Sequence, residues 1–219
     1  MILMKRLAIT ILIFLLGGCS LSQRLSEVSY LDLDEIEAEK KSYSVAVVFS
    51  KDLKSHTLSS YPAIPSFSEI ELEVGQCLCT YLEQAVGVAY QSVTALEKKP
   101  QPGIFDRILY ISLDYSSYMF SSPSAFDSFN SQIVPRPDRV TYILSIEIKA
   151  INGESMDLFG TTEVEANSSF PRGGKEEAEH EKLKDAVRRA VQQVSFKVAN
   201  LLLSGFAEPK GHHFLWLSD

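Results

Sequence analysis

The 219-residue sequence lacks the motifs that mark most enzymes. It has only four histidines, three cysteines and one tryptophan. The nucleophile elbow Gly-x-Ser-x-Gly, the zinc motif His-Glu-x-x-His, the phosphate-binding loop Gly-x-x-x-x-Gly-Lys-[Ser/Thr] and the dinucleotide motif Gly-x-Gly-x-x-Gly are all missing. We therefore expect a protein that is not an enzyme, with no catalytic residues and no cofactor.

The histidines do not suggest a metal site. His212 and His213 are adjacent near the end of the chain, and adjacent histidines without a rigid third ligand bind metals poorly. His56 follows a polar stretch, and His180 lies at the start of a polar helix. An envelope hydrolase that gathers His56 or His180 with an acid and a serine is the weakest alternative.

Basic residues are scarce relative to acidic ones. The chain has 21 Lys and Arg against 28 Asp and Glu, a net charge of −7, and without Lys5 and Arg6 the balance is 19 against 28, or −9. Nucleic-acid binding needs a basic face that replaces counterions, and no such stripe is present, so we exclude it. Attachment to a membrane through charge is excluded for the same reason.

The first twenty residues have the pattern of an export signal. Lys5 and Arg6 precede an apolar run over residues 7–16, which is shorter than the ~20 residues of a membrane-spanning helix. Small residues follow in Leu16-Gly17-Gly18-Cys19. We predict that residues 1–18 are a signal peptide, cleaved between Gly18 and Cys19, and an uncleaved membrane anchor is the alternative.

Leu16-Gly17-Gly18-Cys19 resembles the lipobox of bacterial prolipoproteins, in which the cysteine is acylated and becomes the new N-terminus. The resemblance implies that Cys19 is the lipidation site. It also implies delivery to the outer membrane, because Ser20 stands where an aspartate usually retains the protein at the inner membrane. The folded part would then face the periplasm. Multiple acylation makes such an anchor lasting, because one chain binds only marginally.

The mature chain divides into three parts. Residues 19–42 are rich in Ser, Glu, Asp and Lys, which predicts a lipidated N-terminus followed by a flexible tether. Residues 43–205 are enough for a single globular domain with its own core. Residues 206–219 form an apolar tail.

The pattern of the domain predicts an α+β two-layer sandwich of order β-α-β-β-β-α, with two amphipathic helices on one face of a mostly antiparallel sheet. The predicted strands span residues 43–49, 103–115, 139–151 and 155–169. The first helix follows a loop over 51–67, begins at the capping box Ser68-Glu69-Ile70-Glu71 and stops at Gly87. The second helix has an apolar stripe from Leu183 to Leu202 and ends at Gly205.

Two of the strands are expected to form a hairpin. Asn152-Gly153 is a strong signal for a tight turn, because both residues tolerate positive φ. Val164 and Ala166 should face the core, with Glu163 and Glu165 in water. Glycoside hydrolysis needs two carboxylates at a particular distance from each other, and Asp114, Glu163 and Glu165 are the candidates. The sequence does not fix the distances between them, and carboxylates on the solvent-exposed face of a strand are common without any such role.

Cys77 and Cys79 remain once Cys19 is modified. They lie two apart in a predicted helix and point about 200° apart, so they cannot bridge each other. Cys77 falls on the apolar stripe and should be buried. Cys79 lies off it, and the sequence leaves open whether it pairs with a second chain.

Two aromatic segments are candidate partner contacts. One is a long predicted loop over residues 116–138, and the other is the apolar tail. Their rings either bind a partner or pin each segment to its own domain. The candidate contact residues are Tyr118, Phe120, Phe126, Phe129, Phe214 and Trp216.

A lipid-anchored domain without catalytic motifs suggests a non-catalytic accessory or binding module in an envelope transport or assembly complex. In this respect the chain loosely resembles the auxiliary lipoproteins of envelope transporters and of lipopolysaccharide assembly. We expect two partners: the membrane, through the lipid, and an envelope protein. The alternative is a carrier that binds a lipid or another hydrophobic ligand in an apolar cavity between sheet and helices.

Overall fold

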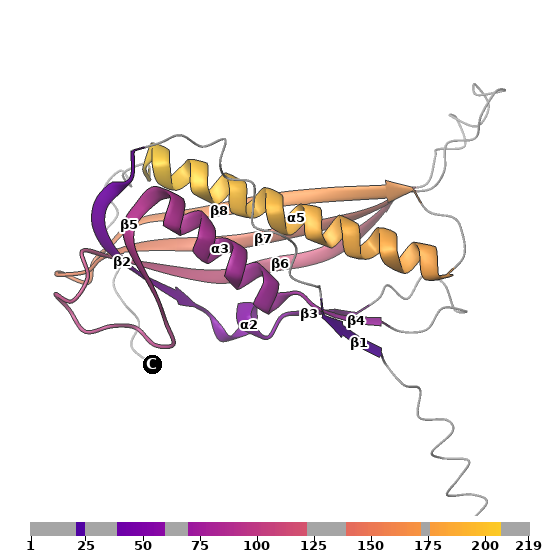
Figure 1. The fold of residues 1–219 in the computed structure, drawn as a ribbon, viewed down its shortest axis with the longest axis horizontal. Coiled ribbons are helices and arrows are strands. Elements are labelled where there is room, and N and C mark those ends of the chain that lie inside the picture. The colour runs from indigo at the N-terminus through magenta and orange to yellow at the C-terminus, as the bar shows by residue number, and fades with distance from the viewer. Residues whose placement is uncertain (1–20, 25–38, 60–69, 122–138, 172–175, 207–219) are drawn as a thin grey trace, which may run out of the picture.

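The fold is a two-layer α+β sandwich, as predicted, in a computed structural model that describes residues 21–24, 39–59, 70–121, 139–171 and 176–206. Helices α3 (Gly75–Ala89) and α5 (Glu176–Ser204) lie side by side on one face of the main sheet (Figure 1). That sheet has the strand order β5-β2-β6-β7-β8. Its strands are β5 (Tyr90–Leu96), β2 (Lys41–Phe49), β6 (Arg107–Ser121), β7 (Arg139–Asn152) and β8 (Leu158–Pro171).

The sheet is mixed, and its antiparallel ladders are the longer ones. Strand β2 pairs in parallel with both β5 and β6, while β6, β7 and β8 pair antiparallel along nearly their whole lengths. Strand β5 was not predicted. Its only buried residue is Tyr90, so it has no apolar alternation that would indicate a strand.

The core lies between the sheet and the two helices. Every second residue of β7 faces it, from Val140 to Ala150, and all of these residues are fully buried, as the alternation predicted. The predicted stripe of α5 is buried at Leu183, Val187 and Leu202, among others. Burying one such side chain contributes about 1.5–3 kcal/mol, so these stripes hold the layers together.

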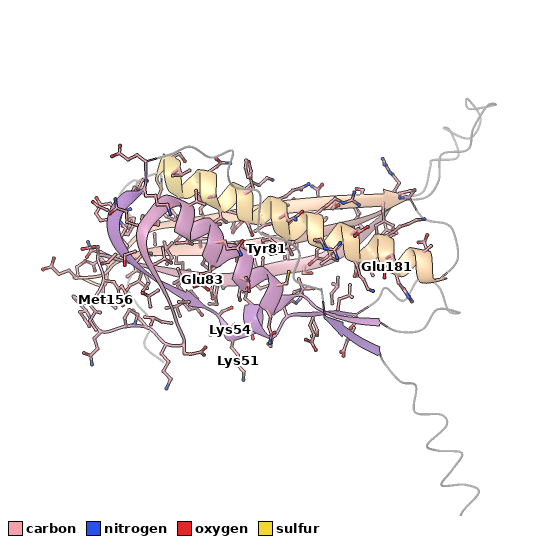
Figure 2. The ribbon with its side chains drawn as sticks, in the orientation of Figure 1. Lys51, Lys54, Tyr81, Glu83, Met156 and Glu181 are labelled. Carbon is pink, nitrogen blue, oxygen red and sulfur yellow. The ribbon has the colours of Figure 1, made fainter. Side chains whose placement is uncertain are left out.

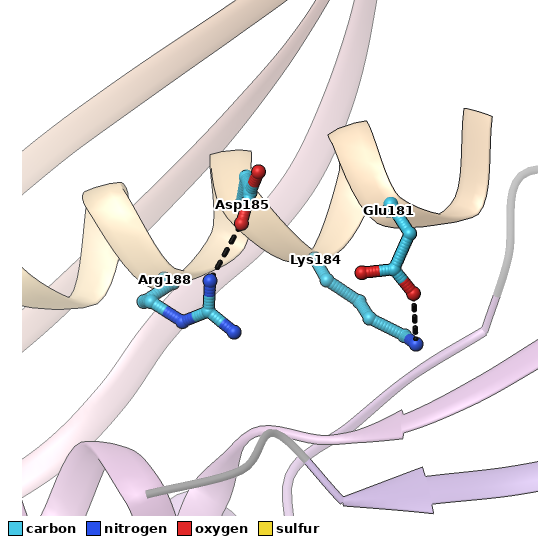
Figure 3. A network of polar contacts seen from close by, with 4 residues as sticks. All are labelled: Glu181, Lys184, Asp185 and Arg188. Carbon is cyan, nitrogen blue, oxygen red and sulfur yellow. Dashed lines mark hydrogen bonds and ion pairs between the residues drawn. The ribbon is translucent and has the colours of Figure 1, made fainter. Parts of the chain in front are cut away.

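Ion pairs join residues of successive turns along one side of α5 (Figure 3). Lys184 contacts Glu181 at 2.7 Å, and Arg188 contacts Asp185 at 2.5 Å. Pairs at this spacing contribute about 0.2–0.5 kcal/mol each. The helix ends at Gly205, where φ is 93°, so the predicted glycine stop is confirmed.

The predicted start and end of the first helix are wrong. Residues Ile70–Glu73 form strand β4, and α3 begins only at Gly75. The sequence alternates there, with Leu72 fully buried between the half-exposed Glu71 and Glu73, which suits a strand better than a capping box. At the other end α3 continues through Gly87 to Ala89.

A second, small sheet also corrects the prediction of a tether and of a plain loop. Strands β1 (Leu21–Arg24), β4 and β3 (Thr57–Ser59) lie side by side in the order β1-β4-β3. Strand β3 and helix α2 (Lys51–Lys54) fall inside the predicted loop. Strand β1 falls inside the predicted flexible tether and pairs in parallel with β4. A strand of this length has no apolar period that could have revealed it.

The β7–β8 hairpin is present, but its turn differs from the prediction. Gly153 to Asp157 form a longer loop, in which the side-chain oxygen of Asn152 accepts hydrogen bonds from the amides of Glu154 and Ser155. The positive φ, 63°, belongs to Met156 and not to Asn152 or Gly153. The connection is therefore an Asx turn within a loop.

Candidate functional site

One arginine, one lysine and three aromatic rings gather where strands β2, β5, β6 and β8 begin. We call Lys41, Tyr43, Tyr90, Arg107 and Phe159 the Arg107 cluster. The guanidinium carbon of Arg107 lies 4.1 Å from the ring centroid of Tyr43 and 5.2 Å from that of Phe159. Both distances are within the range of a cation–π contact.

Strand alternation explains why these side chains meet. Arg107 is two residues before Leu109, which is fully buried beneath the helices, and it therefore points to the same side of the sheet. Tyr43 is likewise two residues before the buried Val45, which pairs with Arg107 across the strands. The core ends at the row of residues that contains Arg107 and Tyr43. The side chain of Arg107 therefore lies on the core side of the sheet and still reaches the surface.

The charge of Arg107 also affects a tyrosine hydroxyl. Arg107 lies close enough to Tyr90 for its charge to act on the hydroxyl of that residue. Burial raises the pKa of Tyr90, while the charge of Arg107 opposes this shift, so the hydroxyl stays neutral at ordinary pH. The N–H groups of a guanidinium lie in its plane, which is the geometry that binds carboxylates and phosphates with two parallel hydrogen bonds.

Lys41 joins this cluster to the end of α5. Its Nζ donates a hydrogen bond to the backbone carbonyl of Leu202, 2.6 Å away in the last turn of the helix. Burial, and secondarily the charge of Arg107, lowers the pKa of Lys41 below its usual value. The carbonyl at the helix end partly offsets this cost, because that end carries the negative pole of the helix dipole.

The nearest carboxylate in sequence, Asp106, is bonded to Ser44, and the charge of Arg107 acts on it only as a minor cause of its lowered pKa. Asp106 accepts hydrogen bonds from the backbone amide and the hydroxyl of Ser44, both at 2.7 Å, and these bonds lower the pKa of Asp106. In the described part of the chain, no ion pair joins Arg107 or Lys41 to a carboxylate. The cluster can therefore receive an anionic or aromatic group from outside.

Sequence reasoning missed the Arg107 cluster. Its members come from four strands, so no local motif contains them. One signal was available: Arg107 occupies a position in phase with the apolar residues Leu109 and Ile111. A charge at an inward position of a strand is unusual and needs a partner.

Only one of the predicted contact residues can be placed in full. Tyr118 belongs to β6 and not to a loop, because β6 continues to Ser121 and pairs there with β7. Its ring packs against that of Tyr142, with the centroids 5.6 Å apart. Phe120 belongs to the same strand. The other predicted contacts and both cleavage-site residues lie outside the described residues: Gly18, Cys19, Phe126, Phe129, Phe214 and Trp216.

The residues considered for catalysis belong to separate elements. His56 lies between α2 and β3, and His180 lies in α5. On the sheet face opposite the helices, Asp114 accepts a hydrogen bond from Ser145 at 3.1 Å, and Glu165 accepts one from Tyr115. Across the described ranges, no group of three His, Cys, Asp or Glu residues is arranged to hold a metal ion.

Comparisons with known proteins give structural likenesses at low sequence identity. No family model matches the chain, and no curated protein matches it. A protein of Xanthomonas campestris is 11% identical with a TM-score of 0.48, over 81% of this chain and 91% of its own. A minor lipoprotein of Acinetobacter baumannii is 6% identical with a TM-score of 0.47, over 78% of this chain and 100% of its own.

A third structure is rare lipoprotein B of Shewanella oneidensis, 8% identical with a TM-score of 0.36, over 74% of this chain and 91% of its own. Among the helices in the described ranges, none has both the length and the hydropathy of a membrane span.

Proposed function

We propose that the protein is a lipid-anchored component of a bacterial cell envelope, acylated at Cys19 and anchored in the outer membrane. The observation that carries this proposal is Leu16-Gly17-Gly18-Cys19, placed directly after a short apolar run with Lys5 and Arg6 before it. The acidic balance of the chain removes charge as an alternative means of membrane attachment.

The mass of the N-terminal peptide tests the anchor. Purified from membranes, the protein should begin at a Cys19 that carries acyl chains. Cys19→Ala should prevent this modification, so that the fraction of the protein that has been exported and cleaved appears in the soluble fraction of the cell extract. A mature protein that starts at another residue with a free amino group would refute the proposal, whatever its distribution between fractions.

The domain itself we propose to be a non-catalytic accessory or binding module that contacts an envelope protein through the Arg107 cluster. The support is the guanidinium of the half-buried Arg107, which contacts two rings and lies next to a second cation, without an ion-pair partner in the described residues. A side chain that supplies a carboxylate to Arg107, or a ring beside Tyr43, is the expected counterpart.

Photo-crosslinking in cells that make the protein tests this contact. A crosslinking amino acid at Tyr43 is compared with one at Phe196, since both side chains are 41% exposed but Phe196 lies on α5. We expect a discrete adduct with an envelope protein from position 43 only, and its loss in Arg107→Ala. Adducts of equal yield at both positions, or adducts that persist in Arg107→Ala, would refute the contact.

A further inference from the structure

The position of β1 determines which end of the domain lies nearest to Cys19. Strand β1 starts at Leu21, and a single residue separates it from Cys19. Two residues of extended chain span at most about 7 Å, which is the upper limit for the length of the link between Cys19 and β1. The domain is thus joined to the proposed lipid through almost no spacer.

Strand β1 is in turn connected to the core of the domain. It pairs with β4 from Leu21–Ile70 to Arg24–Glu73. Strand β4 pairs with β3, and both contribute buried residues to the main core, Leu72 at 0% exposure and Leu58 at 6%. The backbone carbonyl of His56 also accepts hydrogen bonds from the amides of Val74 and Gly75, which ties the residue before β3 to the junction between β4 and α3.

We propose that the end of the domain formed by β1, β3 and β4 rests against the surface of the bilayer, with the opposite end directed away from the membrane. This inference depends on the lipidation of Cys19 in the proposed function. Along the long axis of the domain, the loop containing Met156 lies at one end, and the small sheet lies past the middle toward the other end, at the edge next to α2 (Figures 1 and 2). The occupant of this surface is a layer of lipid headgroups.

The charges at this end indicate that the acyl chains and not electrostatic attraction hold it there. Lys51 and Asp52 are exposed, Glu71 and Glu73 are half-exposed, and Lys54 is paired with Glu97 at 3.1 Å. Among these side chains, four are acidic and two are basic. Headgroup contact should not depend on anionic lipid and should survive high salt.

The orientation places the Arg107 cluster where a partner can reach it. The row of strand starts that carries Arg107 lies beside the loop over residues 153–157, since Arg107 pairs with Asn152 and Gly153 donates to the carbonyl of Asp106. This is the end that points away from the bilayer. A short link at one end and a binding cluster at the other suit a protein that presents a rigid surface at a fixed height.

Quenching by headgroup-labelled lipid tests the orientation on the lipidated protein in vesicles. A fluorophore is attached at Ser59→Cys in β3 or at Glu154→Cys in the far loop, both exposed positions, with Cys79→Ser to remove the partly buried thiol of α3 from the labelling background. A nitroxide on the headgroup quenches only at short range. We expect severalfold stronger quenching at position 59 than at position 154, with neutral lipid and at high salt.

Releasing β1 provides the matched test. In a strand, the amides of successive residues point to alternate sides, so either Ser22 or Gln23 directs its amide toward β4. Replacing both residues by proline removes that hydrogen-bond donor in either case. The pairing that ties the residues next to Cys19 to the domain is then lost, and the difference in quenching should disappear while the protein stays membrane-bound. Ser22→Thr with Gln23→Thr should preserve the difference.

The outcomes separate this inference from the proposed function. Equal quenching at both positions of a protein whose Cys19 is shown to be acylated overturns the orientation and leaves the lipid anchor intact. A difference that persists in the double proline variant shows that β1 does not set the orientation and overturns the inference. An unmodified Cys19 instead overturns the proposed function.

Discussion

Arg107 and Lys41 are neighbouring cations that share no carboxylate in the described part of the chain, yet each is held by groups of the domain. Arg107 lies over the ring of Tyr43 at 4.1 Å, and Lys41 donates to the carbonyl of Leu202 at 2.6 Å. The positive charge of Arg107 contributes to the lowered pKa of Lys41.

Arg107→Met should raise the pKa of Lys41 toward its ordinary value, but only in part, because burial is the larger cause of the shift. Titration of the Lys41 side chain by NMR measures this, and Arg189→Met on the exposed side of α5 is the control. A native Lys41 with a lowered pKa loses its proton before the unfolded chain does. Its contribution therefore makes stability rise as pH approaches 10.5, and the rise should be smaller in Arg107→Met.

Gly153 allows the β7–β8 loop to approach the segment before β6. A Cβ at this position would lie 1.7 Å from the backbone oxygen of Phe105, too close for any real contact. The backbone of Gly153 also bonds to Gly103 at 2.8 Å and to Asp106 at 3.0 Å. Gly153→Ala should therefore lower the free energy of unfolding by about 2 kcal/mol or more, measured by urea denaturation.

Gly87→Ala is the matched control for this substitution. Gly87 lies within α3, and nothing is found within 4 Å of the added Cβ. Alanine favours the helix over glycine by about 0.5–1 kcal/mol, so this variant should be more stable than the parent. Destabilisation of similar size in both variants would contradict the close approach at Gly153.

The elements predicted correctly from the sequence are those with a long, regular apolar period. Strand β7 alternates over its whole length, and α5 repeats its apolar residues through most of its turns, so packing and local pattern agree. The strands β1, β3 and β4 are too short for a period to develop. The pattern Ser68-Glu69-Ile70-Glu71 fits both a capping box and the start of a strand, and tertiary pairing decides between them.

The Arg107 cluster shows why a site of this kind is not readable from a sequence. Lys41 and Tyr90 face each other because β2 and β5 pair in parallel, and β5 itself left no recognisable pattern. Arg107 meets Tyr43 because β6 pairs on the other side of β2. Strand order is a property of the whole fold, so residues from four strands can be grouped only after that order is known.

Tyr115 and Glu165 face each other on the open face of the sheet. The hydroxyl of Tyr115 donates to the carboxylate of Glu165, and this bond is the main cause that raises the pKa of Tyr115. Glu165→Ala should therefore lower the pKa of Tyr115 toward 10, followed by the absorbance of tyrosinate or by NMR. Glu163→Ala removes only a more distant charge and should have a smaller effect, so equal shifts in the two variants would argue against the hydrogen bond.

Cys79 should be an unreactive thiol in the folded protein, and we predict that it forms no disulfide between chains. Burial raises the pKa of Cys79 to about 12, with Lys54 opposing and Glu83 adding to the shift. At pH 9 about one thiol in a thousand is then ionised, against about half in the unfolded chain, and the thiolate is the reactive form. Alkylation by iodoacetamide, located by mass spectrometry, should be slower by two orders of magnitude or more than in urea.

Two charged neighbours of Cys79, Glu83 and Lys54, shift its pKa in opposite directions, so substitutions at these positions should change the rate of alkylation in opposite directions. Glu83→Gln removes a charge that raises the pKa of Cys79, so alkylation should become faster, whereas Lys54→Met removes a charge that lowers it, so alkylation should become slower. Because the folded thiol keeps its proton longer than the unfolded one, stability should fall as pH rises from 9 to about 12, and Cys79→Ser should reduce this fall. Rapid alkylation of the native protein, or a disulfide-linked dimer on a non-reducing gel, would show that Cys79 is accessible and ionised and would contradict the burial seen in α3.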